Sequence, residues 1–143
     1  MKKLLYLFLA ITIISCSKDD SSEPQTFFEK YDGVVWQKND SDPDYTYRLQ
    51  FNNATQPSVT SYDGSFGGSV CVSSLIEDGN NELTEINEDG FIILGEFIED
   101  SIVYSYSATI EVSENGNQLT ITYSDDLDFP ETYNRTILND PCQ

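Results

Sequence analysis

Three aspartates at alternate positions come closest, by residue type and spacing, to a metal site in this chain: Asp40, Asp42 and Asp44. Carboxylates at positions one, three and five begin the common twelve-residue calcium-binding loop. That loop also needs glycine at position six and glutamate at position twelve, where this chain has Tyr45 and Phe51. The pattern therefore favours a solvated acidic turn. The alternative is a looser cation site, formed by these aspartates or by a second acidic group: Asp125, Asp126 and Asp128.

Catalysis by a nucleophile and a base has little support in the sequence. The chain contains no histidine, so neither a Ser-His-Asp nor a Cys-His arrangement can be built. The glycine-rich segment 63–68 is not followed by a helical pattern, which argues against a phosphate-binding loop. The 25 acidic residues include no pair that the sequence singles out for glycoside hydrolysis. We therefore expect a protein that is not an enzyme and that uses no cofactor.

The first residues have the layout of an export signal. Met1-Lys2-Lys3 precedes an apolar run from Leu4 to Ile14, and Ser15-Cys16 follows it. The apolar run is too short to cross a bilayer, which takes about 20 residues. This leader resembles the signal peptide of bacterial lipoproteins. The resemblance implies that residues 1–15 are removed, that the Cys16 thiol is acylated, and that the membrane is a partner of the protein through this lipid.

Residues 16–25 are interpreted as the lipidated cysteine followed by a flexible tether. The segment after Cys16 consists of polar and charged residues and reaches Pro24 without a hydrophobic side chain. Its start, Lys18-Asp19-Asp20, resembles the surface-export signal of Bacteroidetes lipoproteins. The resemblance implies anchoring in the outer membrane at the cell surface, with the periplasmic face as the alternative.

The two cysteines outside the leader are Cys71 and Cys142. An even pair in an exported chain favours a disulfide, which would close a loop of about 70 residues and add roughly 4 kcal/mol of stability. Two free thiols are the alternative. A zinc site is disfavoured because the chain has no histidine and neither cysteine has a Cys-x-x-Cys partner.

Charge restricts the class of partner. The formal net charge is −18, and removal of Lys2 and Lys3 with the leader would make it more negative. Such a chain repels phosphate-bearing polymers, so we expect no nucleic-acid partner. The acidic surface is explained by solubility, with recognition of a basic partner as the alternative.

The domain that must position any site spans residues 26–143 and is expected to be all-β. Residues 25–31 fit one or two helical turns that end at Gly33. Beyond them, polar residues alternate with apolar and aromatic ones over segments 45–51, 102–112, 119–123 and 133–137, and Asp-Gly or Asn-Gly dipeptides separate many of the runs. The continuous apolar run 91–94 predicts a strand covered on both faces. Eight or nine sequential antiparallel strands predict an up-and-down barrel or half-barrel.

Three segments are distinctive in this layout: Gly33-Val34-Val35-Trp36, the expected strand Leu119–Thr122, and Tyr133-Asn134-Arg135-Thr136. With these segments the layout resembles the lipocalin-like domains of Bacteroidetes surface lipoproteins. In lipocalins a tryptophan closes one end of the barrel beneath an arginine. The resemblance implies that Trp36 and Arg135 form such a plug, where a guanidinium stacked on an indole is favourable.

With catalysis and nucleic-acid binding disfavoured, we expect this protein to bind a small ligand or another protein. The chain has nine tyrosines, eight phenylalanines and one tryptophan, and aromatic rings suit both lipidic and sugar ligands. One hypothesis is a barrel that binds a small amphipathic or saccharide ligand. The other is an acidic protein–protein interaction module with a filled barrel, such as an accessory subunit of a surface complex or an inhibitor. The candidate ligand-binding residues are Tyr45, Tyr47, Phe91, Tyr104, Tyr106 and Tyr123.

Overall fold

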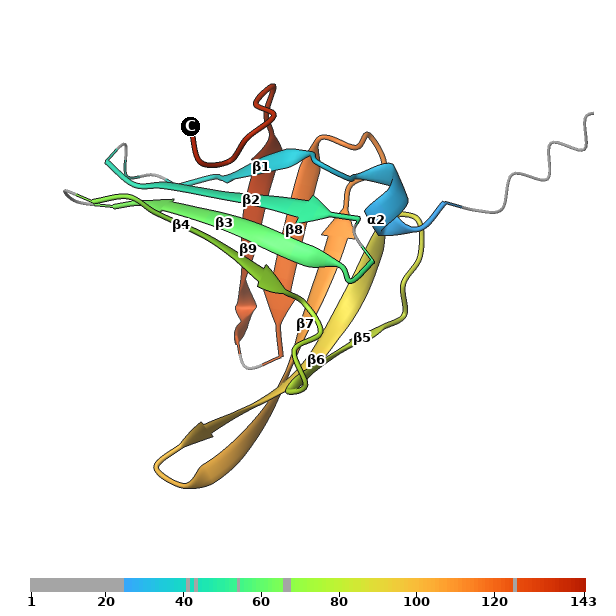
Figure 1. The fold of residues 1–143 in the computed structure, drawn as a ribbon, viewed down its shortest axis with the longest axis vertical. Helices are drawn as coiled ribbons and strands as arrows, with labels where there is room; N and C mark the ends of the chain where they lie inside the picture. The colour runs from blue at the N-terminus through green and yellow to red at the C-terminus, as the bar shows by residue number, and fades with distance from the viewer. Residues whose placement is uncertain (1–24, 41, 43, 54, 66–67, 125) are drawn as a thin grey trace, which may run out of the picture.

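The computed structural model describes residues 25–40, 42, 44–53, 55–65, 68–124 and 126–143 (Figure 1). One short helix, α2 (Phe27–Lys30), precedes nine strands. The strands are β1 (Val35–Lys38), β2 (Thr46–Asn52), β3 (Ser58–Gly64), β4 (Val70–Leu75), β5 (Asn81–Thr84), β6 (Gly90–Glu99), β7 (Ile102–Val112), β8 (Gln118–Tyr123) and β9 (Asp126–Arg135).

All nine strands belong to one antiparallel sheet whose order is β4-β3-β2-β1-β9-β8-β7-β6-β5. Neighbours in sequence form hairpins, except for β4 and β5, and the first strand pairs with the last, with Trp36 opposite Arg135. This pairing bends the meander into the strongly curled sheet seen in Figure 1. Strands β4 and β5 are the two edges and do not pair with each other. The prediction of an all-β barrel or half-barrel with a short leading helix is confirmed, and its form is a half-barrel.

Helix α2 is short but well capped. The Thr26 backbone N–H donates to the Glu29 carboxylate at 2.8 Å, the reciprocal half of a capping box. Gly33 adopts φ +70°, the left-handed conformation that the sequence predicts after the helix. Lys30 then donates to Glu88 (2.6 Å) and Asp89 (2.8 Å), which connects the helix to the turn before β6. Across the described residues, no helix has the length and apolarity needed to cross a bilayer.

Aromatic side chains of α2 close one end of the half-barrel. Phe27 is fully buried, and its ring lies 5.3 Å from that of Phe51 and 4.8 Å from that of Phe91. Phe28 packs on Phe91 as well, with ring centroids 4.9 Å apart. Edge-to-face pairs of this kind stabilise by about 1 kcal/mol each beyond the area that they bury. The helix is therefore held by packing rather than by its own four residues.

A disulfide joins Cys71 of β4 to Cys142 near the C-terminus, with Cα atoms 5.8 Å apart. This confirms the predicted pairing. The C-terminal segment crosses the outer face of β2, where the Arg48 guanidinium donates to the carbonyl oxygens of Pro141 (3.1 Å) and Gln143. Arg48 also lies over the Tyr62 ring at 5.1 Å. The bond and the arginine together hold the chain end against the edge of the sheet.

The β6–β7 hairpin extends beyond the strands beside it. Strand β5 pairs with β6 only as far as Gly95, and β8 pairs with β7 only from Ala108. The prediction that segment 91–94 is covered on both faces is wrong at its end, because Leu94 points outward and is 43% exposed. A continuous apolar run therefore marks a strand here without marking two covered faces.

We expect the Cys71→Ser/Cys142→Ser double variant to fold with a free energy of unfolding lower by about 2–5 kcal/mol, because the bond closes a loop with a sequence separation of 71. Urea denaturation of residues 17–143 measures this difference. Reduction of the unsubstituted protein is the control and should give a similar loss. Equal stability of the oxidised protein and the double variant would contradict the assignment.

Candidate functional site

The concave face of the half-barrel encloses a cavity of about 500 Å³. This volume lies within the range of pockets that hold small organic ligands. Strands β1–β4 form one wall and β6–β9 the other. The lining residues are Lys38, Tyr45, Tyr47, Leu49, Phe51, Val59, Ser61, Ser74, Ile93, Tyr106, Ala108, Ile110, Ile121, Tyr123, Glu131 and Tyr133.

The cavity has an apolar floor and a polar mouth. Alternation along the strands explains this division, because every second side chain points to the concave face. Near α2 these positions are aliphatic, as in Leu49, Ile110 and Ile121, which are all buried. Farther from α2 they are tyrosines, serines and one ion pair. The arrangement suits a ligand with an apolar body and a polar group at one end.

The ring of Tyr106, in the wall of the cavity, packs over a glycine of the neighbouring strand. Tyr106 pairs with Gly95 in the register of β6 and β7, and a Cβ at Gly95 would collide with the Tyr106 ring and with Asn81. The Tyr106 hydroxyl donates to Asn81 Oδ1 at 2.7 Å. The ring thus packs over bare backbone, the arrangement by which an aromatic residue protects a strand glycine. This fixes one tyrosine of the mouth in place.

The only described ion pair in the lining joins Lys38 of β1 to Glu131 of β9. The other carboxylate oxygen of Glu131 accepts a hydrogen bond from the Tyr133 hydroxyl at 2.8 Å. The hydrogen bond that the Lys38 ammonium donates to Glu131 raises the pKa of Lys38. Burial, followed by the hydrogen bond to Glu131, raises the pKa of the Tyr133 phenol well above its usual range. At physiological pH a buried, neutral phenol therefore lies beside the Lys38–Glu131 pair in the cavity lining.

A second group of rings lies on β2 and just before it. Tyr45 and Tyr47 are stacked, with centroids 6.4 Å apart and planes within 3° of parallel. Tyr47 also approaches Tyr133, with ring centroids 6.3 Å apart. Burial raises the pKa of the Tyr47 phenol, so its hydroxyl keeps its proton. These rings provide flat apolar contact area with hydroxyl groups at the edge.

Four of the six predicted ligand-binding residues line the cavity: Tyr45, Tyr47, Tyr106 and Tyr123. Phe91 instead packs beneath α2 in the core, where it is 2% exposed. Tyr104 lies outside the cavity on the projecting part of β7, where its ring stacks on Phe97 at 5.2 Å.

Sequence reasoning missed several residues of the mouth, among them Tyr133, Lys38 and Glu131. Tyr133 shares the alternating pattern of the last strand, but that pattern does not say which concave positions stay open. Lys38 and Glu131 are far apart in the chain, and only the pairing of β1 with β9 brings them together.

The predicted plug residues Trp36 and Arg135 are cross-strand partners. Trp36 is fully buried, and the ring of Tyr31 meets it at 5.7 Å in an edge-on contact. Arg135 is exposed. The closed end is thus built by Tyr31, Trp36 and the phenylalanines of α2, and stacking of the arginine on the indole stays a prediction.

The acidic turn before β2 uses its carboxylates on its own backbone. The Asp42 N–H donates to Asp40 Oδ1 at 3.0 Å, and the Asp44 N–H donates to Asp42 Oδ1 at 2.9 Å. These are turn-forming hydrogen bonds of the kind that aspartate favours. No group of three potential ligands within the described ranges is arranged to hold a metal. Cys16, Asp125 and the side chains of Asp126 and Asp128 lie outside the described residues.

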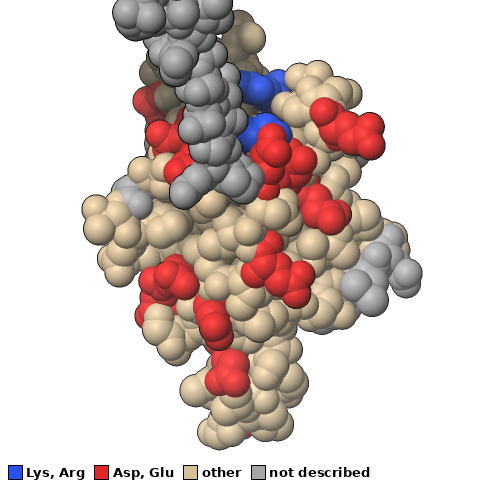
Figure 2. Space-filling view, turned by 90° about the vertical axis from the view of Figure 1, so that its right-hand side faces the viewer, with Lys and Arg blue, Asp and Glu red and all other residues tan. Residues whose placement is uncertain are grey.

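The outer surface carries the acidic excess. Figure 2 shows acidic side chains spread over the face at the α2 end, with basic side chains confined to one small area. Two of the basic residues, Lys30 and Lys38, are neutralised in ion pairs. The surface potential of the described domain is therefore negative, in line with the net charge of −18.

No protein-family model, no curated protein and no solved structure matches this chain. We therefore infer function from the geometry of the half-barrel and from the sequence.

We expect the free energy of unfolding to fall as pH rises above about 10, the pKa of an unfolded tyrosine. Tyr47 and Tyr133 have raised pKa values in the folded state, so above this pH the unfolded chain loses protons that the folded chain keeps. The contribution of these two phenols to the free energy of unfolding is complete below about pH 10. It is lost as pH rises from there toward their raised pKa values in the folded state. Denaturation at several pH values between 8 and 11 measures the fall.

The Tyr133→Phe variant should show a shallower alkaline loss of stability than the unsubstituted protein, since phenylalanine has no proton to lose. Tyr104→Phe, at the exposed ring of β7, is the matched control and should leave the slope unchanged. Identical slopes for all three proteins would rule out the proposed burial of the Tyr133 hydroxyl.

Proposed function

We propose that this chain is an exported lipoprotein, anchored at the outer membrane through Cys16, that binds a small amphipathic ligand in its half-barrel without transforming it. The observation that carries the proposal is the cavity of about 500 Å³, which combines an aliphatic floor with a mouth of tyrosines and the Lys38–Glu131 pair. An elongated ligand would place its apolar part against the floor and its polar group near Tyr47 and Tyr133.

An amphipathic ligand fits this cavity better than a saccharide. Sugars bind between aromatic faces and many hydrogen-bonding groups, whereas the deeper positions here are aliphatic: Leu49, Val59, Ile93, Ile110 and Ile121. Burial of an apolar chain against such a floor stabilises a complex by about 25 cal/mol per Å². The polar groups at the mouth would then fix the orientation of the ligand.

The proposed location is supported by the disulfide as well as by the leader. Bonds such as Cys71–Cys142 form and persist in oxidising compartments, which an exported chain reaches. The order of the N-terminal segments supports the anchor, because a polar tether separates Cys16 from the first buried residue, Phe27.

A protein partner is the second candidate. The β6–β7 hairpin exposes large apolar side chains, among them Ile98 (73%) and Val103 (56%). Apolar groups gathered on a projecting element of an otherwise acidic protein are typical of an interaction surface.

Binding in the cavity is tested with N-phenyl-1-naphthylamine, a small neutral probe that has an apolar ring system and one amine. We expect its fluorescence to rise on addition to residues 17–143. The Ser74→Trp variant should weaken binding at least about tenfold, because Ser74 lines the cavity and indole would fill part of it.

Ser73→Trp is the matched control for this test. Its side chain lies on the opposite face of β4, where its hydroxyl meets that of Thr60 at 2.8 Å, so binding should be retained. Native mass spectrometry of the unsubstituted protein provides an independent check through an adduct that leaves on denaturation. Equal probe binding by both variants, together with an adduct-free mass, would overturn the cavity assignment.

The anchor is tested separately by labelling cells with an alkynyl palmitate. The full chain should incorporate the label and sediment with membranes, and Cys16→Ser should do neither. Cys142→Ser is the matched control. It should remain labelled, because Cys142 is bonded to Cys71 in the folded domain and Cys16 is still present. Label retained by Cys16→Ser would contradict the lipoprotein proposal.

A further inference from the structure

Strand β4 is an unprotected edge of the sheet. It stands last in the strand order and pairs only with β3, along an uninterrupted register from Asp63↔Val70 to Ser58↔Leu75. Half of its backbone N–H and C=O groups therefore point away from the sheet, with no strand beside them in the described part of the chain. Natural edge strands are usually blocked by lysine, proline, a bulge or a covering segment. The sequence of β4, Val-Cys-Val-Ser-Ser-Leu, contains no charge and no proline.

The concave side of β4 is apolar and uncovered. Val72 lies opposite Ser61 in the register, and Val70 lies opposite Asp63, which places both valines on the same face as the cavity residue Ser74. Val70 is 59% exposed and Val72 is 49% exposed. In a closed barrel the next strand would cover such positions, because side chains of neighbouring strands pack against each other on one face. An added strand with apolar residues at alternate positions would cover them here.

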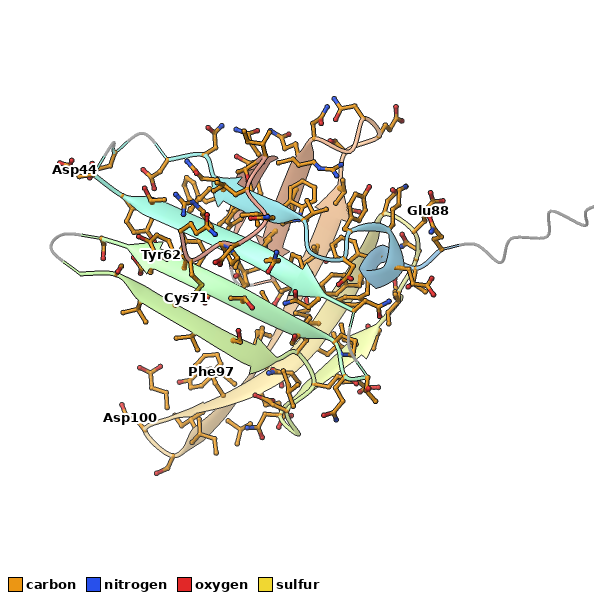
Figure 3. All side chains as sticks on the ribbon, turned by 45° about the horizontal axis from the view of Figure 1, so that its top comes forward. Asp44, Tyr62, Cys71, Glu88, Phe97 and Asp100 are labelled. Carbon is orange, nitrogen blue, oxygen red and sulfur yellow. A yellow bond between two sulfur atoms is a disulfide. The ribbon has the colours of Figure 1, made fainter. Side chains whose placement is uncertain are left out.

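A second uncovered wall lies on the same side of the molecule. Figure 3 shows Phe97 and Asp100 on the β6–β7 hairpin, which projects on the side where β4 forms the edge. Phe97 and Tyr104 stack there and are 45% and 41% exposed. Beyond Gly95 this part of β6 has no described strand partner on its outer edge. The opening of the half-barrel is thus bordered by apolar groups from both sides.

Acidic residues surround this opening. Asp63 is paired with the first residue of β4, and Glu77 and Asp78 follow shortly after its last residue. Glu99 and Asp100 occupy the tip of the facing hairpin. A second copy of the chain would bring a net charge of −18 against the same surface, whereas a basic segment would be attracted to it.

We infer that the free edge of β4 binds an extended segment of a basic partner protein, which adds to the sheet as a further antiparallel or parallel strand. The segment carries apolar residues at alternate positions opposite Val70 and Val72, with lysine or arginine on either side. Main-chain hydrogen bonds supply the binding and the alternate side chains supply the selectivity, as in other cases of strand addition. This inference specifies the second candidate function above and does not depend on a ligand in the cavity.

The first test is selection from a display library of random ten-residue peptides on residues 17–143, which contain the whole described fold. We expect enriched peptides to alternate apolar and polar residues and to carry net positive charge. The Val72→Lys variant should bind them at least about tenfold more weakly, since an inward-pointing lysine on an edge strand opposes strand addition. Ile137→Lys is the matched control, because Ile137 is fully exposed and the charge change is identical.

A second measurement separates strand addition from contact through side chains alone. The best enriched peptide is N-methylated at its even or at its odd positions. Only alternate N–H groups of an added strand face the edge, so one series should lose at least about tenfold in affinity while the other retains it. The alternate amides of Cys71–Leu75 that point away from β3 should also gain protection from hydrogen exchange.

The outcomes distinguish strand addition at β4 from protein binding elsewhere on the surface, from dimer formation and from ligand binding in the cavity. Absence of enrichment, equal binding to Val72→Lys, or equal effects of both methylated series would overturn strand addition at β4. Peptides that still bind Val72→Lys would leave a protein-binding role elsewhere on the surface. Dimers that dissociate on Val72→Lys would identify a second copy as the occupant and would overturn the basic partner. None of these results bears on probe binding in the cavity, which Ser74→Trp tests.

Discussion

The pairing of β1 with β9 shapes the concave face on which both proposals depend. Every other strand pair is a hairpin between neighbours in sequence, and a meander of hairpins alone gives an open twisted sheet. When Trp36 lies opposite Arg135, the two ends of the meander meet in the middle of the sheet and the strands curl around a common interior. The same pairing brings Lys38 to Glu131 at the mouth of the cavity. The aromatic residues of α2 then close the end of that interior.

The curl stops short of a barrel, and the missing pairing has two consequences. Strands β4 and β5 remain edges, so the sheet stays open between them. The concave residues nearest the opening, such as Val72 and Phe97, are left exposed although their strand positions are apolar. A fold that closed completely would bury these groups and would leave room for one small ligand at most. The disulfide at Cys71 restrains the edge strand from the outer face without covering it.

Alternation of side chains is a local property, and it predicted β2, β7, β8 and part of β9, while the apolar run 91–94 predicted part of β6. The expected count of eight or nine strands predicted the half-barrel, but no pattern placed β3, β4 or β5. The disulfide was predicted because the two cysteines outside the leader can pair in only one way. The sequence also identified Tyr47 and Tyr106 as cavity residues. It did not separate them from Tyr104, since alternation assigns a face but does not say where along a strand the body of the domain ends. The turn at Asp100 and Ser101 was missed because both residues adopt positive φ, at 50° and 67°, without a glycine to mark it. Contacts between distant strands were beyond any local pattern.

The open half-barrel is tested most directly by nuclear magnetic resonance of residues 17–143, in which nuclear Overhauser effects report which strands are in contact. We expect nuclear Overhauser effects between the backbones of Trp36 and Arg135, and none between β4 and β5. We also expect that alternate amides of β4 exchange rapidly with solvent in the free protein, while those of β1 are protected. Contacts between β4 and β5, with uniform protection along β4, would show a closed barrel and would contradict both the open cavity and the free edge.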